Sequence, residues 1–174
     1  APEEVINALL TAMIGKAIWS GGKWRILAGG YYTPTLSFDE GDMRGGFKLQ
    51  ANVSRRENFN SVKGTHVSAA ENYIQTDFPP VVGDGTTNAT MANYVAQDNG
   101  EVVYRTITLP FTTSSTMAQR IAKIELERAR QQITVSLALK LIGLKANVGD
   151  VILLDNTRMG WSQKPFEVTA MGIT

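Results

Sequence analysis

Residues 133–141 alternate between apolar and polar or small side chains, and this pattern constrains the fold more than any other in the chain. The apolar members are Ile133, Val135, Leu137, Leu139 and Leu141. Successive side chains of a strand point to opposite faces, so a period of two predicts one strand with a buried face. Residues 47–53 alternate in the same way and predict a second half-buried strand. The chain is therefore expected to fold around sheets.

Two segments have the period of a helix. The first starts at Pro2, whose fixed φ suits a first helical position, and continues with an apolar stripe over residues 5–14 that needs a partner surface. Gly15 is its expected end. The second helix is predicted for residues 116–131, because Thr116 and Gln119 have capping-box spacing and a narrow Ala/Ile/Leu face follows.

Turn residues mark the remaining strands in the first half of the chain. Two apolar runs at 17–19 and 24–27 flank Gly21-Gly22 and predict a β-hairpin. Residues 59–67 predict another strand, weakened by Gly64. The pattern then breaks at Pro79-Pro80.

The second half is easier to divide. Residues 83–85 also break the pattern, and 86–93 are predicted to be an exposed loop. A turn at 98–100 precedes a strand over 101–109 that Pro110 ends. Gly149 provides a turn, after which the strand 151–154 is expected to pair beside 133–141, under the helix 116–131. A last strand starts near Phe166.

These elements predict an α+β fold that is mostly antiparallel β, with two helices packed on two β subdomains, approximately residues 1–100 and 101–174. We expect the buried residues to include Ile121, Leu126, Val135, Leu137, Leu139, Val151 and Leu153. Burial of one Leu or Ile contributes about 1.5–3 kcal/mol, so Leu137→Asp is expected to prevent folding.

Composition excludes several classes of function. The chain has 174 residues, no cysteine and a net charge of +1. Disulfides, cysteine nucleophiles and thiolate zinc sites are therefore excluded, and the balanced charge argues against nucleic-acid binding. No apolar run approaches the roughly 18–20 residues that a membrane span needs. Because no Met begins the sequence and alternation continues to its last residues, we expect a fragment of a longer protein.

The search for chemistry yields no catalytic, cofactor-binding or metal-binding residues. His66 is the only histidine and no Gly-x-Ser-x-Gly motif accompanies it, so it is interpreted as a solvated strand residue. The acidic run 39–42 lacks the spacing and the closing Glu of a calcium loop and is interpreted as a solvated turn. The carboxylate candidates for glycoside hydrolysis are Asp39, Asp42, Asp84, Asp98 and Asp150. Most of these lie near Gly or Asn, where Asp is favoured as a turn residue.

Glycine pairs, tryptophans and sequons have equally simple interpretations. The pairs at 21–22, 29–30 and 45–46 do not form a phosphate-binding motif and predict turns instead. Trp19 and Trp24 lie in the predicted hairpin, where cross-strand packing is the common use of aromatic residues; with Trp161 they are also candidates for a sugar platform. Asn52 and Asn88 begin matches to the N-glycosylation pattern, which matters only in a secretory pathway.

Three stretches in order carry a family resemblance. They are GGKWRILAG at 21–29 followed by Pro34, then LPFTT at 109–113 with AQRIA at 118–122 and residues 125–130, and LKANVGDVILL at 144–154. Together they resemble the tail-tip attachment or host-specificity proteins of long-tailed phages, within the baseplate-hub group. Val148 stands where this family often has Pro. Residues 30–99 match poorly.

The resemblance implies a function and an assembly. Such hubs are built from β-barrel-like domains and assemble as trimers below the tail tube, with no catalytic residues known to us. We therefore expect a virion component made in the host cytoplasm, with tube, distal tail and fibre proteins as partners, indirect contact to a receptor, and no cofactor. The alternatives are a tail-borne cell-wall hydrolase or sugar-binding module, or the hub of a bacterial injection system.

The expected oligomeric state differs between the fragment and its parent. The resemblance to trimeric hubs implies that the parent is a ring-like homotrimer, in keeping with closed cyclic symmetry as the usual solution for repeated subunits. In the fragment, we expect the helices and strands to bury their apolar faces, so that no large apolar surface is left over. The fragment alone is therefore expected to be a monomer or a weak oligomer.

Overall fold

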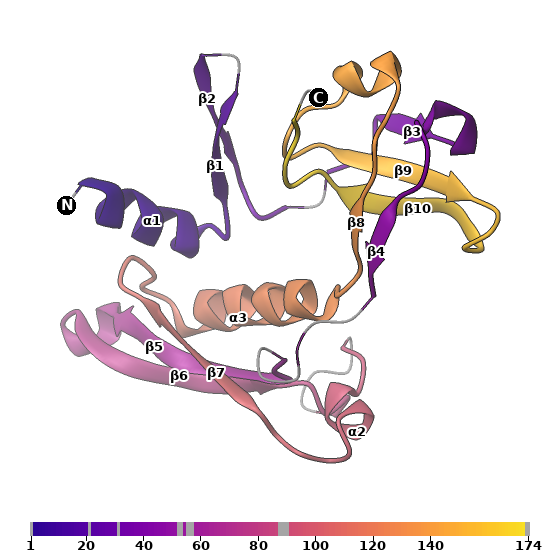
Figure 1. Cartoon of the computed structure of the whole chain (residues 1–174). Coiled ribbons are helices and arrows are strands. Elements are labelled where there is room, and N and C mark those ends of the chain that lie inside the picture. Colours follow the sequence, from indigo (N-terminus) through magenta and orange to yellow (C-terminus); the bar gives the residue numbers. More distant parts are fainter. Residues whose placement is uncertain are drawn as a thin grey trace. The chain divides into compact units, whose positions relative to one another are not determined.

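The computed structural model describes residues 2–20, 22–30, 32–51, 54, 58–86 and 91–172. Its contacts divide the chain into two compact units that interleave along the sequence (Figure 1). Unit 1 consists of Ala1–Gly15 and Ala51–Gln132, and unit 2 of Lys16–Gln50 and Ile133–Thr174. The boundary near residue 100 that the sequence pattern predicts stays a prediction.

Unit 1 is a three-stranded sheet with a long helix on it. The strands are β5 (Ser61–Ser68), β6 (Ile74–Val82) and β7 (Tyr104–Leu109), in the order β6-β5-β7. β5 is antiparallel to β6 and parallel to β7. Helix α3 (Ser115–Arg130) packs against β5 and β6. The unit also holds α1 (Pro2–Ala12), α2 (Tyr94–Gln97) and the 3-10 turn η2 (Ala69–Glu71).

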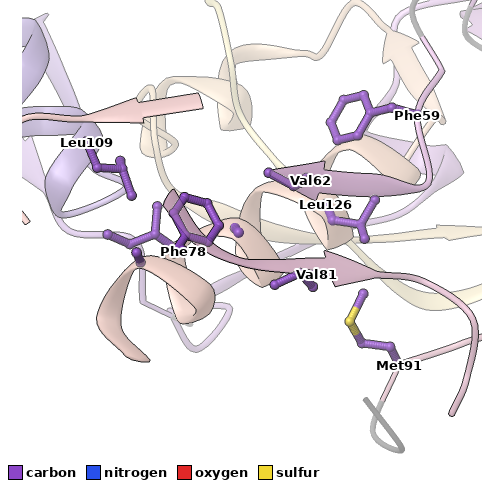
Figure 2. Close-up of a cluster of buried hydrophobic side chains, with 10 residues drawn as sticks. Phe59, Val62, Phe78, Val81, Met91, Leu109 and Leu126 are labelled. Atoms are coloured by element: carbon purple, nitrogen blue, oxygen red, sulfur yellow. The ribbon is translucent and has the colours of Figure 1, made fainter. Parts of the chain in front are cut away.

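The core of unit 1 lies between α3 and this sheet, as Figure 2 shows. Its buried members are Phe59, Val62, Phe78, Val81, Met91, Leu109, Ala118, Ile121, Ala122 and Leu126. The helix contributes residues spaced three and four apart, so a single apolar face meets the sheet. Met91 is 6% exposed, which corrects the expectation that 86–93 is wholly an exposed loop.

Unit 2 contains three small sheets. The first is a hairpin of β1 (Lys16–Ser20) and β2 (Lys23–Leu27). The second has the order β10-β9-β3, where β3 is Leu36–Phe38, β9 is Val151–Asn156 and β10 is Trp161–Glu167. The third joins β4 (Lys48–Gln50) to β8 (Thr134–Ser136). Unit 2 also contains the 3-10 turns η1 (Glu40–Asp42) and η3 (Leu141–Lys145). Its buried core consists of Phe38, Ala146, Ile152 and Leu154.

The α+β class is confirmed, and so are the hairpin, the two main helices and the strand that ends at Leu109. Among the described residues no sheet closes into a barrel, which corrects the barrel-like expectation. The sheets are also mixed, because β3 pairs with β9 and β5 with β7 in parallel. The start of α3 differs too: its N-cap is Ser114, whose side chain caps no backbone N–H, so the predicted capping box at Thr116 is wrong.

The long strand expected over residues 133–141 is wrong. Only Thr134–Ser136 forms a ladder, an isolated bridge joins Leu139 to Met43, and Leu141 begins a 3-10 turn with 85% of its surface exposed. The partner explains the interruption, because β4 is three residues long and follows Gly45, whose φ is +93°. Alternation specified an extended backbone, but the partner strand was too short to pair along all of it.

Three further expectations about the neighbouring elements are wrong. β9 pairs with β10 and β3 rather than with residues 133–141. Helix α3 covers the sheet of unit 1, to which it belongs, and not the sheet that contains β9. Pro79 and Pro80, where the sequence pattern breaks, lie inside β6 all the same. They are tolerated because β6 is an edge strand and the register shifts there, from Val62↔Val81 to Gly64↔Phe78.

Burial follows the expected list only in part. Ile121 and Leu126 are buried, whereas Val135, Leu137, Leu139, Val151 and Leu153 are half-buried. In β9 the opposite face is the buried one, with Ile152 at 7% and Leu154 at 1% exposure. Leu137 packs against the core of unit 2 from outside a strand, so the effect of Leu137→Asp stays a prediction.

Gly64 lets two backbones approach closely in the centre of unit 1. A Cβ atom at this position would lie 1.8 Å from the carbonyl oxygen of Ile107 in β7. Residue 64 is paired with Ile107 in the parallel ladder, so the obstacle is backbone and cannot rotate away. The glycine that weakened the predicted strand is thus required for its pairing.

A polar network joins the ends of several elements in unit 1. The fully buried Asn60 donates from Nδ2 to Asp98 Oδ2 at 2.9 Å and to the Glu101 carbonyl at 2.7 Å, and its Oδ1 accepts the Val103 N–H at 2.8 Å. Arg130, at the end of α3, donates to both oxygens of Asp98 at 2.8 and 3.2 Å. The bonds from Arg130 lower the pKa of the Asp98 carboxyl, although partial burial acts in the opposite direction.

Gly64→Ala is expected to lower the free energy of unfolding by at least about 3 kcal/mol, because the methyl group forces β5 and β7 apart. Urea unfolding followed by circular dichroism measures this change. Gly46→Ala is the matched control: a Cβ there meets nothing within 4 Å, so we expect a change within about 0.5 kcal/mol. Equal stability of the two variants would show that β5 and β7 do not pair at Gly64.

Asp98→Asn is expected to lower the free energy of unfolding at pH 7 by about 2–3 kcal/mol, between the values of exposed and fully buried ion pairs. The folded-state pKa of Asp98 lies below its unfolded value of about 3.9, so its contribution is complete above about pH 5 and is lost as pH falls through the folded pKa. Urea unfolding at several pH values should therefore show the difference from wild type shrinking below about pH 4.

Arg130→Gln serves as the reciprocal variant for this network. It should remove the same pH dependence, and the double variant should be less destabilised than the sum of the two single ones, because both changes break one interaction. Additive effects would mean that the two side chains act independently.

Candidate functional site

The candidate carboxylates each hold a local turn or an ion pair. Asp39 and Asp42 cap each other across η1, and Asp84 accepts the N–H of Thr86 at 2.9 Å. Asp98 belongs to the Asn60 network, and Asp150 accepts the N–H of Asn147 at 2.9 Å. Within the described ranges, no group of three His, Asp or Glu side chains is placed to hold a metal ion.

His66 is buried, so its interpretation as a solvated residue is wrong. The side chain is 4% exposed, its Nδ1 lies 3.1 Å from the Thr76 carbonyl oxygen, and the ring packs edge-on against Phe78. β5 is the central strand of its sheet, so a strand on each side and α3 above leave little room for water. This histidine contributes to packing.

An open hollow of about 560 Å³ in unit 2 is lined by Asp39, Glu40, Asp155 and Trp161, among others. Its carboxylates accept hydrogen bonds from the protein itself. Thr157 N–H donates to Glu40 at 2.7 Å, and Gln163 N–H donates to Asp155 at 2.7 Å. The hollow is therefore a junction of turns whose acids are already used for structure, and Trp161 packs against Phe47 and Phe166.

The hairpin β1–β2 presents two different faces. The register pairs Ile18 with Arg25 and Lys16 with Leu27, so these four side chains share one face. This anchored face packs within unit 2 on the turn at Gly149, where the Cδ1 atoms of Leu27 and Ile18 lie 2.3 and 2.8 Å from the position of an added Cβ. Any side chain at Gly149 would displace them, and its φ of +88° also favours glycine.

Two ion pairs hold the same face. Arg25 Nη2 lies 2.9 Å from Asp150 Oδ1, and Lys16 Nζ lies 2.7 Å from Glu167 Oε1. Burial alone would raise the pKa of Asp150, but hydrogen bonds from Arg25 and Asn147 outweigh it and lower that pKa. Asp150, which its sequence context predicts to be a turn residue, thus also holds the hairpin.

The other face, which we call the aromatic face, consists of Trp19, Trp24 and Ile26 with the smaller Ala17. Trp19 and Trp24 are cross-strand partners whose rings meet edge to face with centroids 5.2 Å apart, so the predicted packing is confirmed. Their exposures are 59% and 67%, and Ile26 is 65% exposed. Large apolar side chains gathered on one face mark an interaction surface. This aromatic face is the candidate functional site.

Two sequence features add nothing to the site. The asparagines of the glycosylation matches, Asn52 and Asn88, lie outside the described residues. In the part of the chain that the structure describes, the helices are too short or too polar to cross a membrane.

The fold has relatives among solved structures. One is a chain in the virion of a native gene transfer agent particle, with a TM-score of 0.69 and 18% identity over 96% of this chain and 35% of that one. A tail protein from Neisseria meningitidis MC58 has a TM-score of 0.51 and 13% identity over 92% and 45%. The 43 kDa tail protein of prophage MuSo2 from Shewanella oneidensis has 0.48 and 15% over 94% and 45%. The chain thus spans less than half of each.

The sequence itself has a family. No curated protein matches it significantly. Residues 1–171 match the model of the family described as "Putative phage tail protein", in agreement with the resemblance read from the three ordered stretches. Since this match covers almost the whole sequence, the chain belongs to that family of phage tail proteins.

Proposed function

We propose that the chain is a structural part of a phage or prophage tail tip, within a baseplate hub that links the tail tube to host-attachment parts. The observation that carries this proposal is the family match over residues 1–171. The fold similarity to a chain of a gene transfer agent virion supports a place in a particle. The full-length protein would then be a homotrimer, with tube, distal tail and fibre proteins as neighbours and the receptor contacted indirectly.

The surface of the chain supports a role in assembly. On the aromatic face of the hairpin, Trp19, Trp24 and Ile26 are 59%, 67% and 65% exposed. Monomeric proteins rarely gather such side chains on one face, whereas subunit interfaces require them. The acids of unit 2 that line the open hollow serve turns, so they give no support to the hydrolase alternative.

Labelling of intact particles tests the position. Antibodies against this chain, with gold detection in electron microscopy, should mark the end of the tail farthest from the head. Antibodies against the tube protein provide the control, since they should mark the tail along its length. Label on the head or along the whole tube would contradict the hub proposal.

An activity test addresses the alternative. The purified chain should release no fragments from peptidoglycan or capsule, with a known cell-wall hydrolase as the positive control. Turnover that is lost in Asp155→Asn would establish a hydrolase and overturn the structural proposal.

A further inference from the structure

The hairpin β1–β2 stands apart from the core of the unit to which it belongs. In the described part of the chain it forms a two-stranded sheet of its own, separate from the β10-β9-β3 sheet and from β4 and β8. None of its described apolar side chains is part of the buried core of unit 2 or among those packed against that core. A two-stranded hairpin by itself is marginally stable at best in water. Its order therefore depends on the contacts that fasten it.

The apolar part of this anchor within unit 2 is small. Ile18 and Leu27 contact the turn at Gly149, where the partner residue has no side chain. Both apolar side chains are only half-buried. Because the stabilisation from apolar burial follows the area removed from water, this contact holds the hairpin less firmly than the core holds β9.

Two ion pairs supply the rest of the anchor, and both lie at one end of the β9–β10 pair. Asp150 directly precedes β9, and Glu167 is the ladder partner of Val151, the first residue of β9. The side chains of Arg25 and Asp150 are 44% and 18% exposed, and those of Lys16 and Glu167 are 44% and 39% exposed. Since all four side chains are partly exposed, separating them leaves no buried charge behind, and salt screens their attraction.

The chain on both sides of the hairpin allows it to move. Gly15 precedes β1, and residues 28–30 and 32–35 after β2 belong to no helix or strand. Opening the anchor therefore breaks no pairing of β9, whereas unfolding β9 would disrupt both of its ladders and expose the core of unit 2. Proteins open locally where such contacts are fewest, at a free energy below that of global unfolding.

We propose that the hairpin is a hinged arm that opens from unit 2 while the sheet β10-β9-β3 stays folded, and that the ion pairs to Asp150 and Glu167 are its latch. The closed latch sets the orientation of the aromatic face, so Arg25 and Lys16 are positioning residues for the candidate site. A partner that binds this face more tightly on the open arm shifts the equilibrium towards opening. The inference goes beyond the proposed function, because it concerns a motion within the chain.

Hydrogen exchange of the 174-residue chain, followed by mass spectrometry, tests the arm. Once the hairpin is released, its two strands no longer hold each other firmly, so their amides exchange. The amides of β1 and β2 should exchange at least about 30-fold faster than those of β9, which report whether unit 2 remains folded. Equal rates in the hairpin and in β9 would overturn the proposal, because the two would then open together.

Arg25→Gln and Glu167→Gln test the latch. Each variant removes one ion pair, so each should speed exchange in β1 and β2 about three- to tenfold, while exchange in β9 changes less than about twofold. Lys23→Gln is the matched control, because it removes a positive charge of the same hairpin that takes part in neither ion pair, and it should change hairpin exchange less than about twofold. Unchanged hairpin exchange in the first two variants would show that these pairs are no latch.

Gly149→Ala tests the apolar part of the anchor. The added Cβ displaces Leu27 and Ile18, so hairpin exchange should rise at least about tenfold. Gly160→Ala is its control, since Gly160 also has a positive φ, of +65°, but a Cβ there meets nothing within 4 Å. Equal hairpin exchange in the two variants would contradict the anchor at Gly149. If Gly149→Ala fails to fold, rapid exchange in β9 reveals it, and Arg25→Gln with Glu167→Gln decides the question.

Ionic strength provides an independent measurement. Between 0.1 and 1 M potassium chloride the Debye length falls from about 10 to about 3 Å, so hairpin exchange in the wild-type chain should rise about threefold. The double variant Arg25→Gln with Glu167→Gln lacks both pairs, and its hairpin exchange should change less than about 1.5-fold over the same range. A wild-type hairpin that does not respond to salt, or a double variant that responds like wild type, would overturn the latch.

Discussion

The side chain of Asn60 is completely buried, and unit 1 is closed around its hydrogen bonds. Its side-chain amide bonds to Asp98 after α2 and, through Glu101 and Val103, to the segment that leads into β7. Asp98 in turn holds Arg130 at the end of α3. The Asn60 carbonyl also accepts the N–H of Gly83 after β6. A buried amide without hydrogen-bond partners destabilises a fold by more than its hydrogen bonds stabilise it when they form. Each of these segments is therefore held in the position that keeps its hydrogen bond to Asn60. Across the described residues, every buried side-chain nitrogen or oxygen has a partner, and apolar packing of α3 on the sheet can proceed without a polar penalty.

How much of the fold the sequence could predict depended on how far apart the interacting residues are. The hairpin at Gly22 and the apolar face of α3 follow from neighbours within a few residues, and both were predicted. The alternation at 133–141 predicted an extended backbone but could not show that its partner β4 has only three residues. Pro79 and Pro80 are acceptable only on an edge strand at a register shift, and a strand's place in its sheet is a tertiary property. The buried side of β9 was also set by its partners β3 and β10, since both faces of residues 151–154 are apolar.

For the candidate site, the sequence could predict the packing of the two tryptophans, which are close in the chain, but not the orientation of the hairpin, which depends on distant residues. Two tryptophans around a tight turn indicate cross-strand packing, and Trp19 and Trp24 do pack in this way. Apolar content alone would place these rings inward and Arg25 outward, yet the hairpin has the opposite orientation. Arg25 and Lys16 pair with Asp150 and Glu167, which come from the C-terminal part of unit 2, and Gly149 leaves space for Ile18 and Leu27. The side chains that decide this orientation lie more than a hundred positions away in the sequence, so no local pattern contains it. A hairpin fixed by ion pairs on one face can leave aromatic rings exposed on the other.

The interleaving of the two units has a consequence for how unit 2 can form. β3 pairs with β9 and β4 with β8, which requires closing loops of roughly a hundred residues before any contact compensates the lost chain entropy. Unit 1 reduces this cost, because it is formed by the intervening residues Ala51–Gln132 together with the N-terminal segment. Near its two ends, Gln132 donates to Asn58 at 3.2 Å, and Arg130 donates to the same oxygen at 3.0 Å. These bonds bring Asn58 and Gln132 into contact. Gln50 lies shortly before Asn58 in the sequence and Thr134 lies shortly after Gln132, and these two residues form the first pair of the β4–β8 ladder. Burial of the four side chains in the core of unit 2 therefore need not offset the full entropy cost of closing the chain, because the network around Asp98 already holds the ends of the intervening segment together.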